Sequence, residues 1–275
     1  MASLPDPAKA KSLADARKQT HHAAQLATAA GISFLPKQAD DSHTNLEWLP
    51  ALGALASRLV PAAAPFRVAV RIIDLELRVL DDRNATAACL PLNGRRIVDA
   101  ETWLRERVAE RGAPAAKFTL ARHYEIPHHA VGDGSAFETS DRGAFTELAA
   151  WFDLAAEVLE SVRARNDGSE IRCWPHHFDI ATLITVEDAK TVGVGLEPGD
   201  TYYDEPYFYV NANPRPAAGT ALARLAGDGS WHTHEWFGAV LPGSRIRSSS
   251  SSRAQADEFL NSAIAACRQF VLGGR

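Results

Sequence analysis

Residues 171–210 read IRCWPHHFDIATLITVEDAKTVGVGLEPGDTYYDEPYFYV, and this stretch decides the fold. Three parts of it, 171–186, 191–196 and 207–211, are rich in the β-branched and aromatic residues of strands, with Pro, Gly and Asp turns between them. The links are too short to hold the helix that joins parallel strands, so we expect neighbouring strands to be antiparallel. A further strand is predicted over 236–241.

Helices are predicted before and after this β region. Residues 8–30 have a helix-forming composition, and the helical spacing of apolar residues is clear over 144–164 and 252–271. Strands outnumber helices. The sequence therefore predicts a single α+β domain over residues 1–275, a mostly antiparallel sheet with helices packed on one side, among them the N-terminal and C-terminal helices.

Composition limits the classes of partner. The formal net charge is -5 and basic residues are interspersed with acids, which argues against a nucleic-acid partner. No apolar run is long enough to span a bilayer, and residues 1–18 lack the apolar core of a signal peptide. The three cysteines have no CxxC spacing. We expect a cytoplasmic protein with no membrane partner, and no pattern indicates an oligomeric state.

Two histidine pairs suggest a metal site. His177 and Asp179 are two apart, so on a strand they would face the same side. His232 or His234 from a later strand would complete the two-histidine, one-carboxylate face of non-haem iron sites. We predict these four residues as ligands of a divalent metal, Fe or Zn. The alternative is that Asp179 caps a turn and the histidines bond to backbone.

Three further residues are predicted to be catalytic. Glu205 precedes Pro206 and an aromatic run, where it could project into a cleft and have its pKa raised by aromatic neighbours. His43 lies in the polar segment 40–45, DDSHTN, and His176 precedes His177. The alternatives are a solvated acid at a strand end for Glu205 and a plain loop for 40–45. His123, His128 and His129 are predicted to lie on the surface.

Several stretches together resemble a family of uncharacterised bacterial proteins catalogued as a domain of unknown function. They are QTHHAAQLATAAG, DDSHTNLEW, WPHHFDIATLI, GLEPGDTYYDEPYFYV and WHTHEWFGAVLPGSRI, and they cover nearly the whole chain. The resemblance implies an intracellular protein of this size. It also implies that the polar segments form one unit, and it assigns no activity.

The sequence thus leaves three functions open. The first is an intracellular small-molecule enzyme or ligand-binding protein whose pocket is lined by His, Asp, Glu and aromatic residues and holds a metal in one version. The second is an oxygenase-like facial-triad site. The third is a noncatalytic interaction module whose aromatic side chains form an exposed patch: Trp174, Tyr207, Tyr209, Trp231 and Trp236. No dinucleotide, phosphate-loop, serine-hydrolase or zincin motif is present.

Overall fold

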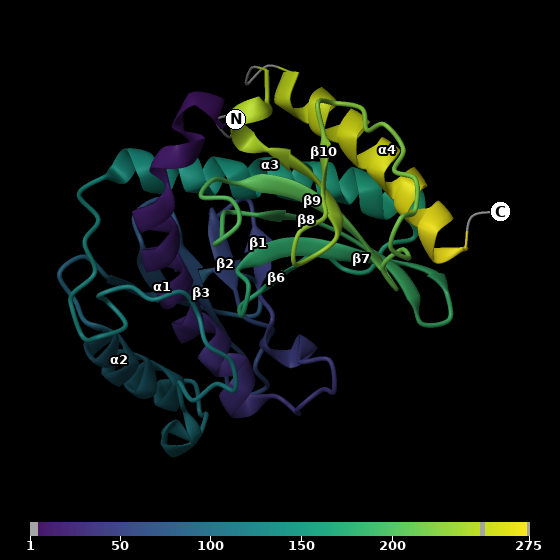
Figure 1. Ribbon diagram of the computed structural model, residues 1–275. Coiled ribbons are helices and arrows are strands. Elements are labelled where there is room, and N and C mark those ends of the chain that lie inside the picture. The colour runs from purple at the N-terminus through teal and green to yellow at the C-terminus, as the bar shows by residue number, and fades with distance from the viewer. Residues whose placement is uncertain (1–4, 248–250, 274–275) are drawn as a thin grey trace. The chain divides into compact units, whose positions relative to one another are not determined.

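The computed structural model describes residues 5–247 and 251–273. The chain divides into two compact units, each built around its own sheet (Figure 1). Unit 1 comprises residues 1–14, 150–172 and 179–275, and unit 2 comprises residues 15–149 and 173–178. Three described elements cross the boundary along the chain: α1 (Ala14–Phe34), α3 (Arg142–Asn166) and β6 (Arg172–Trp174).

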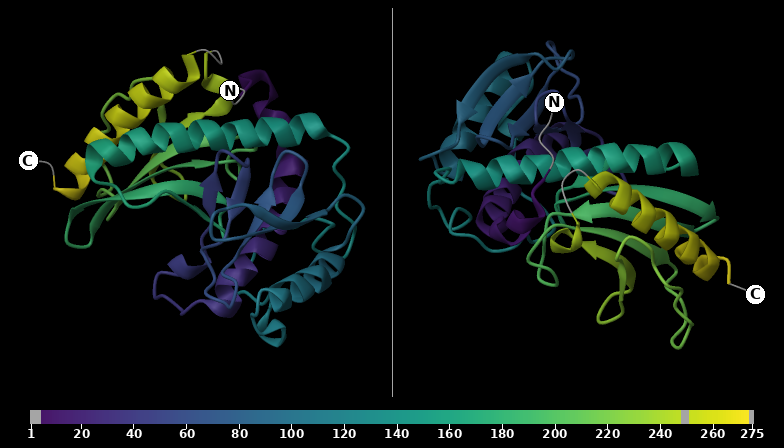
Figure 2. Two further views of the ribbon diagram at one scale, coloured as in Figure 1. Left: turned by 180° about the vertical axis from the view of Figure 1, so that it is seen from behind. Right: turned by 90° about the horizontal axis from the view of Figure 1, so that it is seen from above.

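Unit 2 contains a five-stranded antiparallel sheet in sequence order. Its strands are β1 (Glu47–Leu49), β2 (Ala54–Ala56), β3 (Arg67–Arg71), β4 (Glu76–Leu80) and β5 (Thr86–Pro91). Helix α1 (Ala14–Phe34) runs along one face of this sheet (Figure 2), where Phe34 contacts Phe66 edge-on. The other elements of unit 2 are the 3-10 turns η2 (Ser42–Thr44) and η3 (Ala115–Lys117) and helix α2 (Ile97–Glu110).

Helix α1 differs from the predicted N-terminal helix at both ends. Residues 7–12 form a separate 3-10 turn, η1, in which the Ala8 N–H donates to the Asp6 side chain. The α-helix then continues through Gly31, which the sequence suggested as its end, to Phe34. Gly31 keeps a helical conformation, and its missing side chain makes room for the backbone of η2, as described below.

Unit 1 contains the sheet predicted from the opening stretch. Its strand order is β10-β11-β9-β8-β7-β6, and helix α4 (Ser252–Val271) packs on β8, β9 and β11 (Figure 2). Ion pairs Arg253–Glu157 and Arg165–Asp257 join α4 to α3. The remaining elements are β7 (Asp179–Glu187), β8 (Lys190–Glu197), β9 (Tyr207–Asn213), β10 (Ser230–His232), β11 (Gly238–Pro242) and the 3-10 turn η4 (Gly243–Arg245).

The α+β class and the antiparallel pairing are confirmed, but the strands form two sheets instead of one. Alternation along a strand shows which face is buried, and it carries no information about which strand is the neighbour. Helix α4 has the bounds predicted for the C-terminal helix. Within the described ranges, no helix is both long and apolar enough to cross a membrane.

Candidate functional site

The predicted His177-x-Asp179 pair does not share a strand. Residues 175–178 form a turn between β6 and β7, closed by a 2.7 Å hydrogen bond from the Phe178 N–H to the Trp174 carbonyl. Phe178 adopts a left-handed conformation with φ of 74°. His177 is exposed in the turn, whereas Asp179 is buried at the start of β7. His177 and Asp179 therefore do not share one face of a strand, contrary to the prediction, because the turn interrupts the period of two.

Two side chains of unit 2 bond to the carbonyl of Pro175 in this turn, and a third bonds to one of them. The His21 Nε2–H donates to that carbonyl at 2.8 Å, and the His21 ring stacks on Phe178 with centroids 4.8 Å apart. The Gln25 amide donates to the same carbonyl at 2.9 Å. The Tyr124 hydroxyl in turn donates to Gln25 Oε1 at 2.9 Å. Because these hydrogen bonds are all formed, they fix the backbone of the turn that carries His176 and His177.

Burial keeps the donors of this network in the required protonation states. Desolvation lowers the pKa of His21 to about 3, so its ring is neutral at neutral pH and carries one proton. Burial also raises the pKa of Tyr124, which keeps its hydroxyl proton available to Gln25. His176 lies against Tyr124, with ring centroids 5.8 Å apart, and its pKa is lowered by desolvation and then by the charge of His177.

A cavity of about 300 Å³ opens beside this network, and we call it the histidine pocket. It contains a histidine–carboxylate contact that the sequence did not predict: the His123 Nε2 lies 3.0 Å from Asp41 Oδ2. His123 was predicted to be a surface residue, and its side chain is indeed 63% exposed, at the pocket wall. The pocket is lined by Ile32, Leu35, Lys37, Asp41, His43, Thr44, Ala121, Arg122, His123 and Tyr124.

His43 is buried in this wall. The Gln38 N–H donates to His43 Nδ1 at 3.3 Å, so in the neutral ring the proton is on Nε2. Burial lowers the pKa of His43 and favours that neutral form. Its backbone carbonyl packs directly on Gly31 of α1, where a β-carbon would lie 2.2 Å from the carbonyl oxygen. The glycine therefore sets how close η2 approaches α1.

The structure thus gathers part of the predicted site in unit 2. His43 and Asp41 line the histidine pocket, and the charges of Asp41 and His123 both act on the pKa of His176. The polar segment 40–45 and the turn with His176 consequently belong to one neighbourhood. The sequence did not indicate that His123 contacts Asp41. No local pattern could identify this contact, because the two residues are far apart along the chain.

Glu205, predicted as an acid–base residue, bonds to Ser244 of η4 in unit 1. It is buried, and its two carboxylate oxygens accept hydrogen bonds from the Ser244 N–H at 2.6 Å and the Ser244 hydroxyl at 2.9 Å. Lys11 lies 3.9 Å away but is exposed. These contacts tie the segment before β9 to η4, and a catalytic role for Glu205 stays a prediction.

Glu205→Gln is expected to lower the free energy of unfolding by about 1–3 kcal/mol, because the amide can accept only one of the two Ser244 hydrogen bonds. Urea unfolding of the variant and the wild type measures this loss. Lys11→Gln serves as control and should change stability by less than about 1 kcal/mol, since an exposed ion pair contributes little. Equal stability of Glu205→Gln and wild type would contradict the anchoring role.

The second histidine pair lies at the turn between β10 and β11. His232 Nε2–H donates to the His234 carbonyl at 2.6 Å, so its Nδ1 accepts from the Tyr203 hydroxyl at 3.0 Å. The His232 ring stacks on Trp236 at 4.4 Å, and the His234 side chain is 86% exposed. Across residues 5–247 and 251–273, no group of three or more His, Cys, Asp or Glu side chains could hold a metal ion. The metal site stays a prediction.

The aromatic side chains predicted to form an interaction surface do not make an exposed patch. Tyr207 is buried and its hydroxyl donates to Asp200 at 2.7 Å, while Tyr209 donates to Asp179. Burial, together with these carboxylates, raises the pKa of both tyrosines. The three tryptophans of the predicted patch, Trp174, Trp231 and Trp236, are half-buried.

No protein-family model matches the chain, and none of the curated proteins or solved structures compared with it does so either. The resemblance to an uncharacterised bacterial family therefore stays a prediction.

Proposed function

We propose that the histidine pocket binds a small molecule that carries an oxyanion group, such as a phosphate or a carboxylate. The observation that carries the proposal is the set of donors that line this one cavity. Lys37 and Arg122 bring basic side chains, and His43 brings a neutral ring with its proton on Nε2. Charged donors of this kind are what phosphate and carboxylate oxygens require.

The remaining walls indicate what else the molecule contains. Ile32 and Leu35 are apolar and half-buried, so they favour a carbon skeleton beside the anionic group. A cavity of about 300 Å³ suits a molecule of metabolite size and is too small for a peptide segment of several residues. The substrate class is therefore a small organic oxyanion.

The His123–Asp41 pair gives the pocket a means of moving a proton. Asp41 holds the Nε2 side of the ring at 3.0 Å, which leaves Nδ1 to take a proton from a bound molecule as a general base. Tyr124 contacts the His123 ring edge-on, with centroids 5.4 Å apart, and restricts its orientation. We propose His123 as the base and Asp41 as the positioning residue.

The metal-dependent version of the function has a separate test. Elemental analysis of purified protein, before and after soaking with Fe²⁺ or Zn²⁺, would show stoichiometric metal if His177, Asp179, His232 and His234 act as ligands. Absence of metal that soaking does not restore would remove this version and, with it, the oxygenase-like function. The oxyanion proposal does not depend on the result.

Inorganic phosphate is the simplest probe of the pocket. The ring ¹H–¹³C resonances of His43 and His123 are expected to shift with added phosphate, because both rings line the cavity. Arg122→Gln should weaken the apparent affinity by roughly tenfold, since a charged hydrogen bond to the anion is lost. NMR titration of protein labelled in its histidines measures both effects, with His43→Gln and His123→Gln used for assignment.

His128 is the matched internal control, because its side chain is 80% exposed and lies outside the pocket wall. Its resonance should stay in place while those of His43 and His123 move. Equal shifts of all three resonances, or a titration that Arg122→Gln leaves unchanged, would show that phosphate acts on the surface in general and would defeat the proposal.

A further inference from the structure

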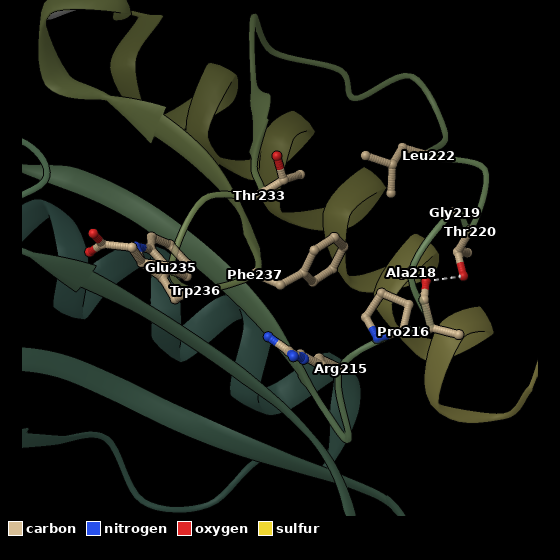
Figure 3. Close-up of a pocket in the computed structure, with 11 residues that line it drawn as sticks. Arg215, Pro216, Ala218, Gly219, Thr220, Leu222, Thr233, Glu235, Trp236 and Phe237 are labelled. Carbon is tan, nitrogen blue, oxygen red and sulfur yellow. Dashed lines mark hydrogen bonds between the residues drawn. The ribbon is translucent and has the colours of Figure 1, made fainter.

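Unit 1 contains a second cavity, of about 360 Å³, between residues 215–222 and residues 233–237 (Figure 3). We call it the aromatic pocket. One wall belongs to the long connection 214–229 from β9 to β10, which has no helix or strand in the described structure. Connections of this length without secondary structure are uncommon in compact domains and frequently carry a binding function. The volume is in the range of small-molecule sites.

The apolar side of the aromatic pocket is built around Phe237. Figure 3 shows its ring directed toward the part of the chain that carries Pro216, Ala218 and Leu222. Two other aromatic rings pack against the Phe237 ring. It stacks on Trp231 with centroids 5.3 Å apart and contacts Phe270 edge-on at 5.8 Å. A rigid, partly open aromatic face of this kind favours a flat apolar group.

The turn that presents Phe237 is strained and firmly bonded. Glu235 adopts a left-handed conformation with φ of 64°, which a residue with a side chain rarely takes. The His234 carbonyl accepts from the Trp236 N–H at 2.7 Å and from His232 Nε2 at 2.6 Å, which fixes the turn. Backbone strain that the surroundings maintain in this way clusters at sites that clamp ligands.

The charged side chains of the aromatic pocket differ in their contacts. Glu235 accepts a hydrogen bond from the Tyr202 hydroxyl, so its carboxylate already has a partner. Arg215 also lines the cavity, and within residues 5–247 and 251–273 no side chain pairs with its guanidinium. A guanidinium without a partner can bind a carboxylate through two parallel hydrogen bonds.

The geometry points to a small aromatic carboxylate as the ligand of the aromatic pocket. Its ring packs on Phe237, and its carboxylate pairs with Arg215. The aromatic pocket lies in unit 1, whereas the histidine pocket lies in unit 2, and the two have no lining residue in common. Their chemistry also differs, because Arg215 and the Phe237 ring would select the ligand of the aromatic pocket. The two sites are tested with different probes.

The probe is 3-(4-fluorophenyl)propanoate, and the neutral amide of the same shape is its control. ¹⁹F NMR line widths report binding of each. Wild-type protein is expected to bind the acid roughly tenfold more tightly than the amide, because only the acid forms the charged pair with Arg215. Arg215→Gln should bring the two affinities together, whereas Arg224→Gln, an exposed arginine farther along the same connection, should leave the preference intact.

A second variant tests the cavity itself. Ala218→Trp places a large side chain in the pocket wall at an exposed position, so the fold is retained and binding of both compounds should be lost. Arg122→Gln in the histidine pocket should leave both affinities unchanged, which separates the two proposals. The inference is overturned if wild-type protein broadens neither signal at millimolar concentration, if Arg215→Gln keeps the preference for the acid, or if Ala218→Trp still binds.

Discussion

Gly31→Ala is expected to lose about 1–3 kcal/mol of unfolding free energy and to lose phosphate binding, although alanine is the better helix former. The added β-carbon would lie 2.2 Å from the His43 carbonyl oxygen and 3.2 Å from its carbon. Both are backbone atoms, so no side chain can rotate away and η2 must move. His43 and Asp41 move with it, and the histidine pocket opens.

Gly143→Ala is the matched control for this substitution. Gly143 is exposed in the first turn of α3, and a β-carbon there would meet only Asp141 Oδ1 at 3.3 Å. Helix propensity then dominates, and the control should be neutral or stabilised by up to about 1 kcal/mol. Urea unfolding and the phosphate titration are measured on both variants. If Gly31→Ala matches the control in both, the close approach of η2 to α1 does not shape the pocket.

Acid is expected to destabilise the protein through His21. Its folded pKa is about 3, below the ordinary value of 6.5, so the folded state binds fewer protons than the unfolded chain between these values. The stabilising contribution is complete above pH 6.5 and is lost as the pH falls toward 3. At pH 4 the loss from this one group is about 3 kcal/mol, since each pH unit costs up to about 1.4 kcal/mol.

His21→Gln separates this effect from general acid denaturation. The amide can still donate to the Pro175 carbonyl, but it does not titrate, so the variant should show a flatter dependence of unfolding free energy on pH between 7 and 4. His128→Gln removes an exposed histidine and should keep the wild-type slope. Parallel curves for wild type and His21→Gln, measured by urea unfolding at several pH values, would refute the assigned role of His21.

Long periodic elements were predictable from sequence because the apolar pattern alone defines them. The stripe Phe259, Ala263, Ile264, Cys267 and Val271 is buried in α4 as helical spacing requires. In the sequence, apolar residues alternate over 66–72 and then in the opposite phase over 73–79, and the tight turn between β3 and β4 lies where the phase changes.

Other features depended on contacts between distant residues and could not be predicted in the same way. The turn at 175–178 needs a left-handed phenylalanine, which composition does not favour, and it is held by side chains from α1 and residue 124. Gly31 suggests a helix end in the sequence, but in the structure it lies inside α1, where η2 packs closely against the helix.

The candidate site was predicted in part for the same reason. The polar segment with His43 and the pair at His176 were recognised by composition, and they lie in one neighbourhood of unit 2. The role of Glu205 depends on Ser244, and that of His123 on Asp41, so each required the tertiary structure.

Lys37, Arg122 and His43 line the pocket in which we propose that an oxyanion binds. The most direct measurement is a crystal structure of the protein soaked in selenate, whose selenium gives an anomalous signal. We predict a peak inside the histidine pocket within hydrogen-bonding distance of the Arg122 guanidinium or His43 Nε2, and its loss in Arg122→Gln crystals. A pocket without a peak, in crystals where selenate binds elsewhere on the same chain, would contradict oxyanion binding in the histidine pocket.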